Sequence, residues 1–192
     1  TLRIPVHGAV LTQAEDEALQ RVIARRWYTE GPECAEFARK LRGYTGARDI
    51  TLCNSGSSAN LLALAALSQS ELGERAILPG DEVITTALCF PTTIAPIVQM
   101  GAVPVFVDVE LPGLLPSPED IAKAVTERTK AVLITHTLGN PFQWERLRGF
   151  DFHGAWFVED CCDALGSPGL FEYADLSTLS FFPAHQVTAG EG

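Results

Sequence analysis

The stretch EVITTALCFPTTIAPIVQMGAVPVFV, residues 82–107, decides the fold class. Its β-branched and apolar residues predict strands at Glu82–Thr86 and Val103–Val107. Between them, Pro91–Met100 has the apolar spacing of a helix that begins with proline. A strand, a helix and a second strand in this order join two parallel strands. The stretch therefore predicts a parallel sheet with helices packed on it.

The same alternation continues on both sides of this stretch. Further strands are predicted at Ile50–Cys53, Ala131–Thr135, Ala155–Val158 and Leu176–Phe181, and further helices at Ser57–Leu67 and Pro118–Val125. Near the start of the chain, Thr12 and Glu15 form a capping box, and Pro32 opens a second helix. We expect an α/β fold with three layers (α/β/α) and a mainly parallel sheet.

The predicted organisation has two parts. Residues 1–48 form an N-terminal helical segment, and residues 49–192 form a large ligand-binding domain. The chain starts at Thr1 without methionine and stops at Gly192 within a predicted turn. We therefore expect that the large domain is truncated at its C-terminus.

Composition argues against several classes of partner. Fourteen Lys and Arg against 24 Asp and Glu give a formal charge of −10, which repels nucleic acid and anionic membrane surfaces. The longest apolar run, Leu61–Leu67, is far shorter than the ~18 residues of a membrane span. The five cysteines form no Cys-x-x-Cys pair, which favours reduced thiols. We expect a cytoplasmic protein with no nucleic-acid and no membrane partner.

Small residues follow the first predicted strand, in the run Asn54–Asn60. Gly56, Ser57 and Ser58 begin a predicted helix, whose free amides, positive dipole end and hydroxyls suit a phosphate group. Plain helix capping by these serines is the alternative interpretation.

Carboxylates follow the apolar strand Ala155–Val158. Asp160 is expected at the end of this strand, where a buried carboxylate needs a cationic partner such as a protonated heterocyclic nitrogen. In the alternative interpretation, Asp160 or Asp163 caps a following helix. Cys161 and Cys162 are interpreted as small buried apolar residues rather than metal or redox ligands.

A histidine follows the last predicted strand. His185 is placed at the edge of the sheet where ligands bind, and imidazole can accept or donate a proton at neutral pH. His7, His136 and His153 are interpreted as structural or surface residues, with a smaller chance that His136 touches a ligand.

Together, five ordered motifs resemble the sugar aminotransferase-like family of vitamin B6 enzymes, with the aspartate aminotransferase fold. More narrowly, they are similar to nucleotide-linked 4-keto-6-deoxyhexose 3-dehydrases of lipopolysaccharide and antibiotic deoxysugar pathways. The motifs are Cys53–Leu62, Phe90–Thr93, His136–Phe142, Glu159–Gly166 and Ser180–His185.

The resemblance implies a cofactor, pyridoxamine or pyridoxal phosphate, bound by the large domain of a type I pyridoxal-phosphate-dependent transferase whose small C-terminal domain is missing here. It implies that Asp160 faces the pyridine nitrogen, Asp163 the ring hydroxyl, and Phe90 the ring itself. The implied phosphate site consists of Gly56, Ser57, Ser58 and Ser180.

His185 stands where the resemblance implies the lysine that binds the cofactor covalently in aminotransferases. Lys40, Lys123 and Lys130 are the chain's only lysines, and none is predicted near this edge. In 3-dehydrases with histidine here, the cofactor is free pyridoxamine phosphate, and His185 is implied as the base for loss of the sugar's 3-hydroxyl. The alternatives are a nucleotide-sugar 4-aminotransferase and a non-catalytic regulator that keeps the fold.

The resemblance also implies partners: a nucleotide-linked keto-deoxyhexose as substrate, and a second copy of the chain in a homodimer. Some 3-dehydrases use a two-iron, two-sulfur cluster and an electron-donating reductase. The five cysteines here do not match the spacing of that cluster, so we expect any such cluster to lie outside this chain.

Overall fold

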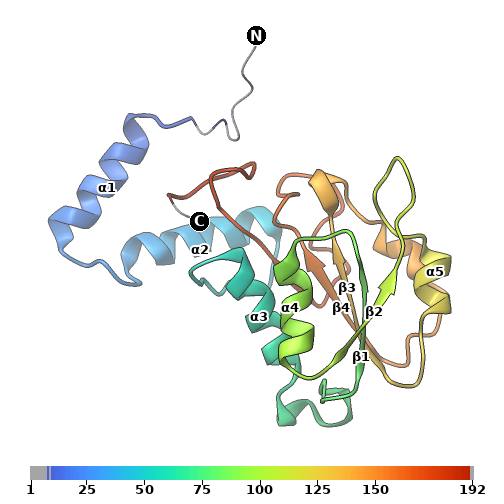
Figure 1. The fold of residues 1–192 in the computed structure, drawn as a ribbon. Coiled ribbons are helices and arrows are strands. Elements are labelled where there is room, and N and C mark those ends of the chain that lie inside the picture. Colours follow the sequence, from blue (N-terminus) through green and yellow to red (C-terminus); the bar gives the residue numbers. More distant parts are fainter. Residues whose placement is uncertain (1–7, 9, 191–192) are drawn as a thin grey trace. The chain divides into compact units, whose positions relative to one another are not determined.

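The structure, a computed structural model, describes residue 8 and residues 10–190 (Figure 1). The chain divides into two compact units, residues 1–53 and 54–192. His7 lies outside the described residues.

Two helices make up the described part of the first unit. Helix α1 (Gln13–Arg25) begins with the predicted capping box, in which Thr12 and Glu15 satisfy each other's backbone amides. Helix α2 (Pro32–Thr45) has proline in its first turn and ends at Gly46, whose φ of 71° suits glycine. Arg25 of α1 and Glu33 of α2 form an ion pair of 2.7 Å. The capping box and the helix start at Pro32 are confirmed.

The second unit contains a five-stranded sheet with the order β2-β1-β3-β4-β5. The strands are β1 (Glu82–Thr86), β2 (Val103–Val107), β3 (Thr129–Thr135), β4 (Trp156–Asp160) and β5 (Leu176–Thr178). Every neighbouring pair is parallel. The carboxyl ends of the strands therefore meet at one edge, where ligands bind in sheets of this kind.

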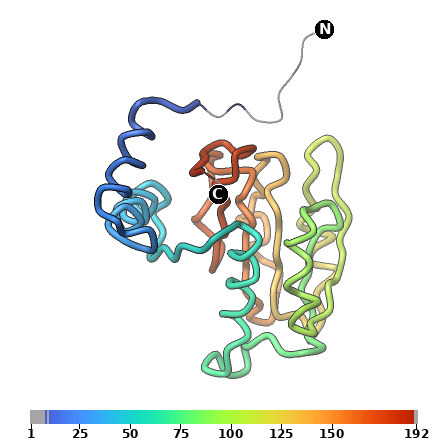
Figure 2. Tube along the Cα trace, turned by 60° about the vertical axis from the view of Figure 1, so that its left-hand side comes forward, coloured from blue at the N-terminus to red at the C-terminus, as the bar shows by residue number. Residues whose placement is uncertain are grey.

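Helices cover both faces of this sheet, because side chains of successive strand residues point to opposite faces. Val83 and Leu133 pack with Leu64 of helix α3 (Gly56–Leu67) and Ile97 of helix α4 (Pro91–Gln99). Figure 2 shows α3 and α4 side by side.

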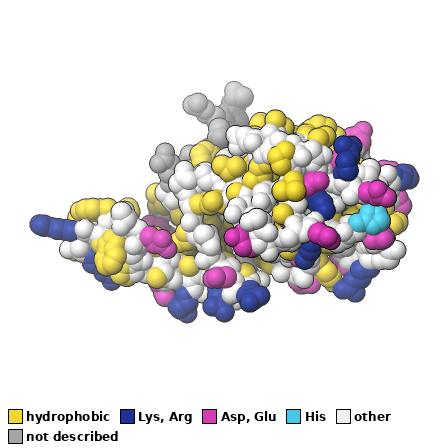
Figure 3. All heavy atoms as spheres, turned by 90° about the horizontal axis from the view of Figure 1, so that it is seen from below, with side chains coloured by type: hydrophobic (Ala, Val, Ile, Leu, Met, Phe, Trp, Pro, Cys, Tyr) yellow, Lys and Arg dark blue, Asp and Glu magenta, His cyan; other side chains and the backbone are white. Residues whose placement is uncertain are grey.

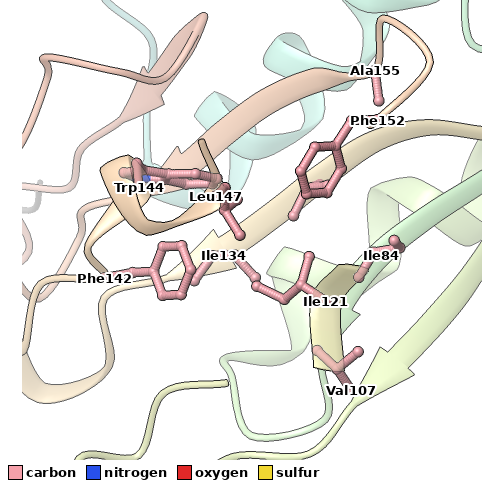
Figure 4. Packing of buried hydrophobic residues seen from close by; sticks show 10 residues of the cluster. Ile84, Val107, Ile121, Ile134, Phe142, Trp144, Leu147, Phe152 and Ala155 are labelled. Atoms are coloured by element: carbon pink, nitrogen blue, oxygen red, sulfur yellow. The ribbon is translucent and has the colours of Figure 1, made fainter. Parts of the chain in front are cut away.

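The opposite face packs on helix α5 (Pro118–Lys123) and the 3-10 turn η3 (Trp144–Leu147). Ile84 and Ile134 of the strands meet Ile121 and Trp144 there, in the apolar cluster drawn in Figure 4. The second unit is thus α/β/α in three layers with a parallel sheet, as predicted.

One predicted strand is wrong, and one is shorter than predicted. Residues 50–53 have no regular secondary structure, and none of β1–β5 pairs with them among the described residues. A β-branched run becomes a strand only where a neighbouring edge is available to it. The last strand ends at Thr178 rather than Phe181.

Within the described residues, no helix is both long and apolar enough to cross a membrane. Figure 3 shows one face of the molecule, on which acidic and basic side chains are interspersed with apolar ones.

Candidate functional site

A cavity of about 490 Å³ opens at the carboxyl edge of the sheet. Its lining comes from the start of α3 and from the segments that follow β1, β3, β4 and β5. The lining includes Gly56, Ser57, Phe90, Asp160, Asp163, Ser180 and His185. These are seven of the eight residues that the sequence singled out, so residues up to 129 positions apart in the chain face one space.

Asp160 lies at the last position of β4 and is 2% exposed. Its Oδ2 accepts hydrogen bonds from Asn60 Nδ2 at 2.9 Å and Thr93 Oγ1 at 2.8 Å. Its Oδ1 accepts from the Cys162 amide at 3.2 Å. No helix follows, since residues 162–166 form turns. The alternative in which Asp160 or Asp163 caps a helix is therefore wrong.

Helix α3 points its N-terminus at the cavity. The Ser55 side chain caps the helix by accepting from the Ser58 amide at 3.2 Å. The amides of Gly56 and Ser57 belong to the first turn, where a helix offers no acceptor of its own. Ser58 does not line the cavity, and its hydroxyl lies 3.2 Å from that of Ser55. The capping interpretation thus fits Ser55 and Ser58, whereas Gly56 and Ser57 border the open space.

Gly56 is packed closely against the segment after β5 and the turn after β4. A Cβ atom at this position would lie 2.7 Å from Ser180 Cβ and 2.9 Å from Cys162 Sγ. Only glycine allows α3 to begin this close to Ser180. The close approach brings the Ser180 hydroxyl to the same side of the cavity as the helix start.

An aromatic ring and unpaired hydroxyls complete the lining. Phe90, the residue before α4, is 66% exposed although it borders the cavity. Thr135 and Thr137, which follow one another closely at the end of β3, each bury an Oγ1 that has no hydrogen-bond partner. Buried polar atoms in proteins are nearly always paired, so these two hydroxyls point to a missing polar partner.

His185 and Asp163 lie together at the cavity. His185 Nδ1 is 3.1 Å from Asp163 Oδ1, and the His185 side chain is 19% exposed. The His185 amide donates to the Phe182 carbonyl at 2.9 Å, and the rings of these two residues meet edge to face at 6.1 Å. The histidine is therefore held by its backbone, by an aromatic neighbour and by a carboxylate.

The lysines are occupied elsewhere. In the unit that contains the cavity, Lys123 pairs with Asp120 at 2.8 Å, and Lys130 donates to the Glu74 carbonyl at 2.8 Å. Lys40 belongs to the other unit and lies 3.6 Å from Glu36. Among the described residues that line the cavity, His185 is thus the one whose side chain has a titratable nitrogen.

Thiols at the cavity are held in the protonated form. Burial, reinforced by the charge of Asp160, raises the pKa of both Cys89 and Cys162, while a hydrogen bond with Thr93 offsets part of the effect at Cys89. Cys161 is fully buried in an apolar cluster, as predicted, whereas Cys162 borders the cavity.

Beneath the cavity lies a buried pair that the sequence did not reveal. His136 and Glu159 are both fully buried, with Nε2 and Oε2 2.9 Å apart. His136 Nδ1 accepts from the Phe142 amide at 2.8 Å, so its proton is on Nε2, which donates to Glu159. Because both ring nitrogens are used, the nearby group His136, Glu159 and Cys161 is a hydrogen-bonded cluster rather than a metal centre.

Glu159 accepts further hydrogen bonds from Trp144, the Phe171 amide and Ser177. Burial by itself raises the pKa of this carboxyl, but the hydrogen bonds that it accepts from His136, Ser177 and the Phe171 amide outweigh burial and lower the pKa. The cluster fixes two loops to β4, directly before Asp160.

Asn60 and Thr93, which donate hydrogen bonds to Asp160, were not singled out by the sequence analysis, although each lies in one of the five motifs. Asn60 lies one helical turn after Gly56, so the two residues share a face of α3. That spacing from the helix start was one available signal for Asn60. For Thr93 the available signal was its place in the motif Phe90–Thr93, because its contact with Asp160 spans 67 positions.

Comparison with known proteins decides the family. Residues 10–192 match the DegT/DnrJ/EryC1/StrS aminotransferase family. The chain belongs to this family. The match covers both units and all five sequence motifs. It confirms the resemblance to the sugar aminotransferase-like family.

Two curated proteins with similar sequences are an enzyme and a protein of lipopolysaccharide biosynthesis. The chain is 47% identical over 192 residues to dTDP-4-dehydro-2,6-dideoxy-D-glucose 3-dehydratase of Saccharopolyspora spinosa, covering 96% of this chain and 41% of that protein. It is 44% identical over 194 residues to lipopolysaccharide biosynthesis protein RfbH of Salmonella typhimurium, covering 98% and 44%.

Among solved structures, the chain is similar to the Escherichia coli GDP-4-keto-6-deoxy-D-mannose-3-dehydratase with bound hydrated PLP. The TM-score is 0.89 at 28% identity, over 98% of this chain and 49% of that one. The chain thus spans less than half the length of each of these relatives.

Proposed function

We propose that this chain is the cofactor-binding part of an enzyme that uses pyridoxamine phosphate to remove the 3-hydroxyl of a nucleotide-linked 4-keto-6-deoxyhexose. The observation that carries this proposal is the cavity itself, where a buried carboxylate, Asp160, and a histidine, His185, face one space without a lysine. The 3-dehydratases among the relatives support the same reaction.

The cavity fits the cofactor. Asp160 is a buried carboxylate without a cationic partner among the described residues, and a protonated pyridine nitrogen supplies one. The start of α3, with Gly56, Ser57 and Ser180, suits a phosphate because first-turn amides and hydroxyls donate to it. The unpaired hydroxyls of Thr135 and Thr137 offer partners for further polar atoms.

Each residue then has a role. Asp160 keeps the ring nitrogen protonated, Phe90 stacks on the ring, and Asp163 faces the ring hydroxyl. When bound, pyridoxamine phosphate supplies an amine for the 4-ketone and a ring that accepts electrons. With the cofactor bound, His185 would accept a proton from the cofactor's methylene group and would donate a proton to the departing 3-hydroxyl, which leaves as water.

The absorbance spectrum of the protein at its natural length tests this function against the two alternatives. We expect reversible binding of pyridoxamine phosphate and no borohydride-reducible bond between the protein and pyridoxal phosphate. Covalent, borohydride-reducible binding indicates the 4-aminotransferase instead. Absence of binding to either form indicates the non-catalytic regulator.

We also propose that the protein is a homodimer. Helix α1 buries none of its residues, and Leu19 and Ile23, one turn apart, are 63% and 62% exposed. Apolar side chains aligned on a helix usually face a partner surface, and closed two-fold dimers are the commonest assembly. Sedimentation that gives a monomer with full activity would contradict this.

The iron–sulfur cluster and the electron-donating reductase, which the resemblance implies for some 3-dehydrases, remain predictions for this protein.

A further inference from the structure

We propose that Asp163 is a positioning residue for His185: its carboxylate holds the proton of the neutral imidazole on Nδ1 and leaves the lone pair of Nε2 for the reaction. The proposal rests on the proposed function, and the contact of 3.1 Å between Asp163 Oδ1 and His185 Nδ1 carries it.

The chemistry of the two groups decides the direction of the proton. A carboxylate oxygen only accepts hydrogen bonds, so the nitrogen that faces it must donate. In neutral imidazole one nitrogen carries the proton and the other carries a lone pair, and the hydrogen bond of one sets the state of the other. A proton on Nδ1 therefore makes Nε2 the base.

The surrounding contacts fix this arrangement from both sides. Asp163 lies in the turn after β4, and its backbone carbonyl accepts a hydrogen bond from the Gln186 side chain. His185 and Gln186 are neighbours, so the turn after β4 and the turn after β5 are joined twice. The edge-to-face contact with Phe182 further limits rotation of the His185 ring.

The same contact is kept when Nε2 takes up a proton. Nδ1 donates to Asp163 Oδ1 in the neutral ring and in the protonated ring alike, so the ring does not have to turn during the reaction. Asp163 Oδ2 is not used in this contact and remains for the ring hydroxyl of the cofactor.

The chain contains an internal comparison. His153 Nδ1 lies 3.3 Å from Asp151 Oδ2, but these side chains are 50% and 77% exposed and neither borders the cavity. Water competes for such an exposed pair, so its contact contributes little. Asp151→Ala is therefore the matched control for Asp163→Ala.

The test measures which nitrogen of His185 carries the proton, by nitrogen-15 NMR of histidine-labelled protein at its natural length, at a pH where imidazole is neutral. The chain has four histidines, and the His185 signals are identified by their loss in His185→Asn. We expect the proton on Nδ1 in the wild type, with and without pyridoxamine phosphate. A proton on Nε2 in the wild type overturns the proposal without any variant.

Two variants test the same proposal by a second measurement. In Asp163→Ala we expect the proton to redistribute toward Nε2 and kcat for dehydration to fall about 10²-fold or more, whereas Asp151→Ala changes neither. Unchanged His185 signals in a folded Asp163→Ala protein overturn the proposal, even if activity is lost. A shifted proton in a protein whose wild type releases no 3-hydroxyl supports the positioning role and contradicts the proposed function instead.

Discussion

Asn60 Nδ2 lies 2.9 Å from Asp160 Oδ2, and both side chains are buried although 100 positions separate them. Asn60 in turn accepts a hydrogen bond from Thr178 Oγ1 at 2.6 Å, and Thr93 donates to the same carboxylate oxygen as Asn60. One carboxylate thus connects α3, α4, β4 and β5. It is held in place before any ligand arrives, which is the requirement for a residue that positions a cofactor.

Removal of this amide should cost stability as well as binding. In Asn60→Ala the buried Asp160 carboxylate loses one of its donors, and we expect a loss of about 1–3 kcal/mol in the free energy of unfolding. Urea unfolding of the protein without cofactor measures this loss. An unchanged midpoint would mean that the contact does not hold Asp160.

The charge of Asp160 is tested by a nearly isosteric change. Asp160→Asn cannot keep a pyridine nitrogen protonated, so we expect most of the affinity for pyridoxamine phosphate to be lost. Asp151→Asn, at an exposed position away from the cavity, is the control and should bind normally. Equal affinity and turnover in wild type and Asp160→Asn would refute the role assigned to Asp160.

The buried pair beneath the cavity predicts a dependence of stability on pH. The pKa of Glu159 is lowered from its ordinary value of 4.5 in the folded state. Its contribution to the free energy of unfolding is therefore complete above pH 4.5 and is lost as the pH falls toward the lowered value.

Glu159→Gln should remove part of this pH dependence. We expect the variant to be less stable than the wild type at neutral pH, with a smaller further loss on acidification, as measured by urea unfolding at several pH values. Parallel stability curves for the two proteins would show that Glu159 does not titrate in this way.

Two glycines give a matched pair of substitutions. Gly56→Ala places a methyl group 2.7 Å from Ser180 Cβ, so we expect a loss of about 1–3 kcal/mol in the free energy of unfolding and weaker cofactor binding. At Gly43, inside α2, an added Cβ atom would meet nothing within 4 Å apart from its own stretch of helix. Gly43→Ala should be neutral or stabilising by up to about 1 kcal/mol. Equal effects at both glycines would show that the close packing of Gly56 has no role.

Much of the fold was accessible from the sequence because its signals are local. Proline and capping residues mark the starts of α2, α4 and α5, and β-branched runs mark the strands of the sheet. The strand predicted at residues 50–53 failed because pairing depends on a neighbour that local sequence does not encode.

For the site, the sequence predicts which edge of the sheet carries the residues but not which side chains pair with one another. Parallel strands bring their carboxyl ends together, so residues such as Asp160 and His185 could be assigned to one edge. The pairs His185–Asp163 and His136–Glu159 could not be predicted. Each pair depends on how loops after different strands orient their side chains. Ser58 shows the same limit, since spacing alone does not separate a capping serine from one that borders the cavity.

The proposed reaction depends on His185, which in place of a lysine moves the proton that accompanies loss of the 3-hydroxyl. The most direct measurement compares wild type with His185→Asn, both loaded with pyridoxamine phosphate and given a nucleotide-linked 4-keto-6-deoxyhexose. Exchange with labelled water follows release of the hydroxyl. We expect His185→Asn to bind the cofactor as wild type does but to react about 10²- to 10⁴-fold more slowly. Equal rates in the two proteins would show that His185 is not the residue that moves this proton.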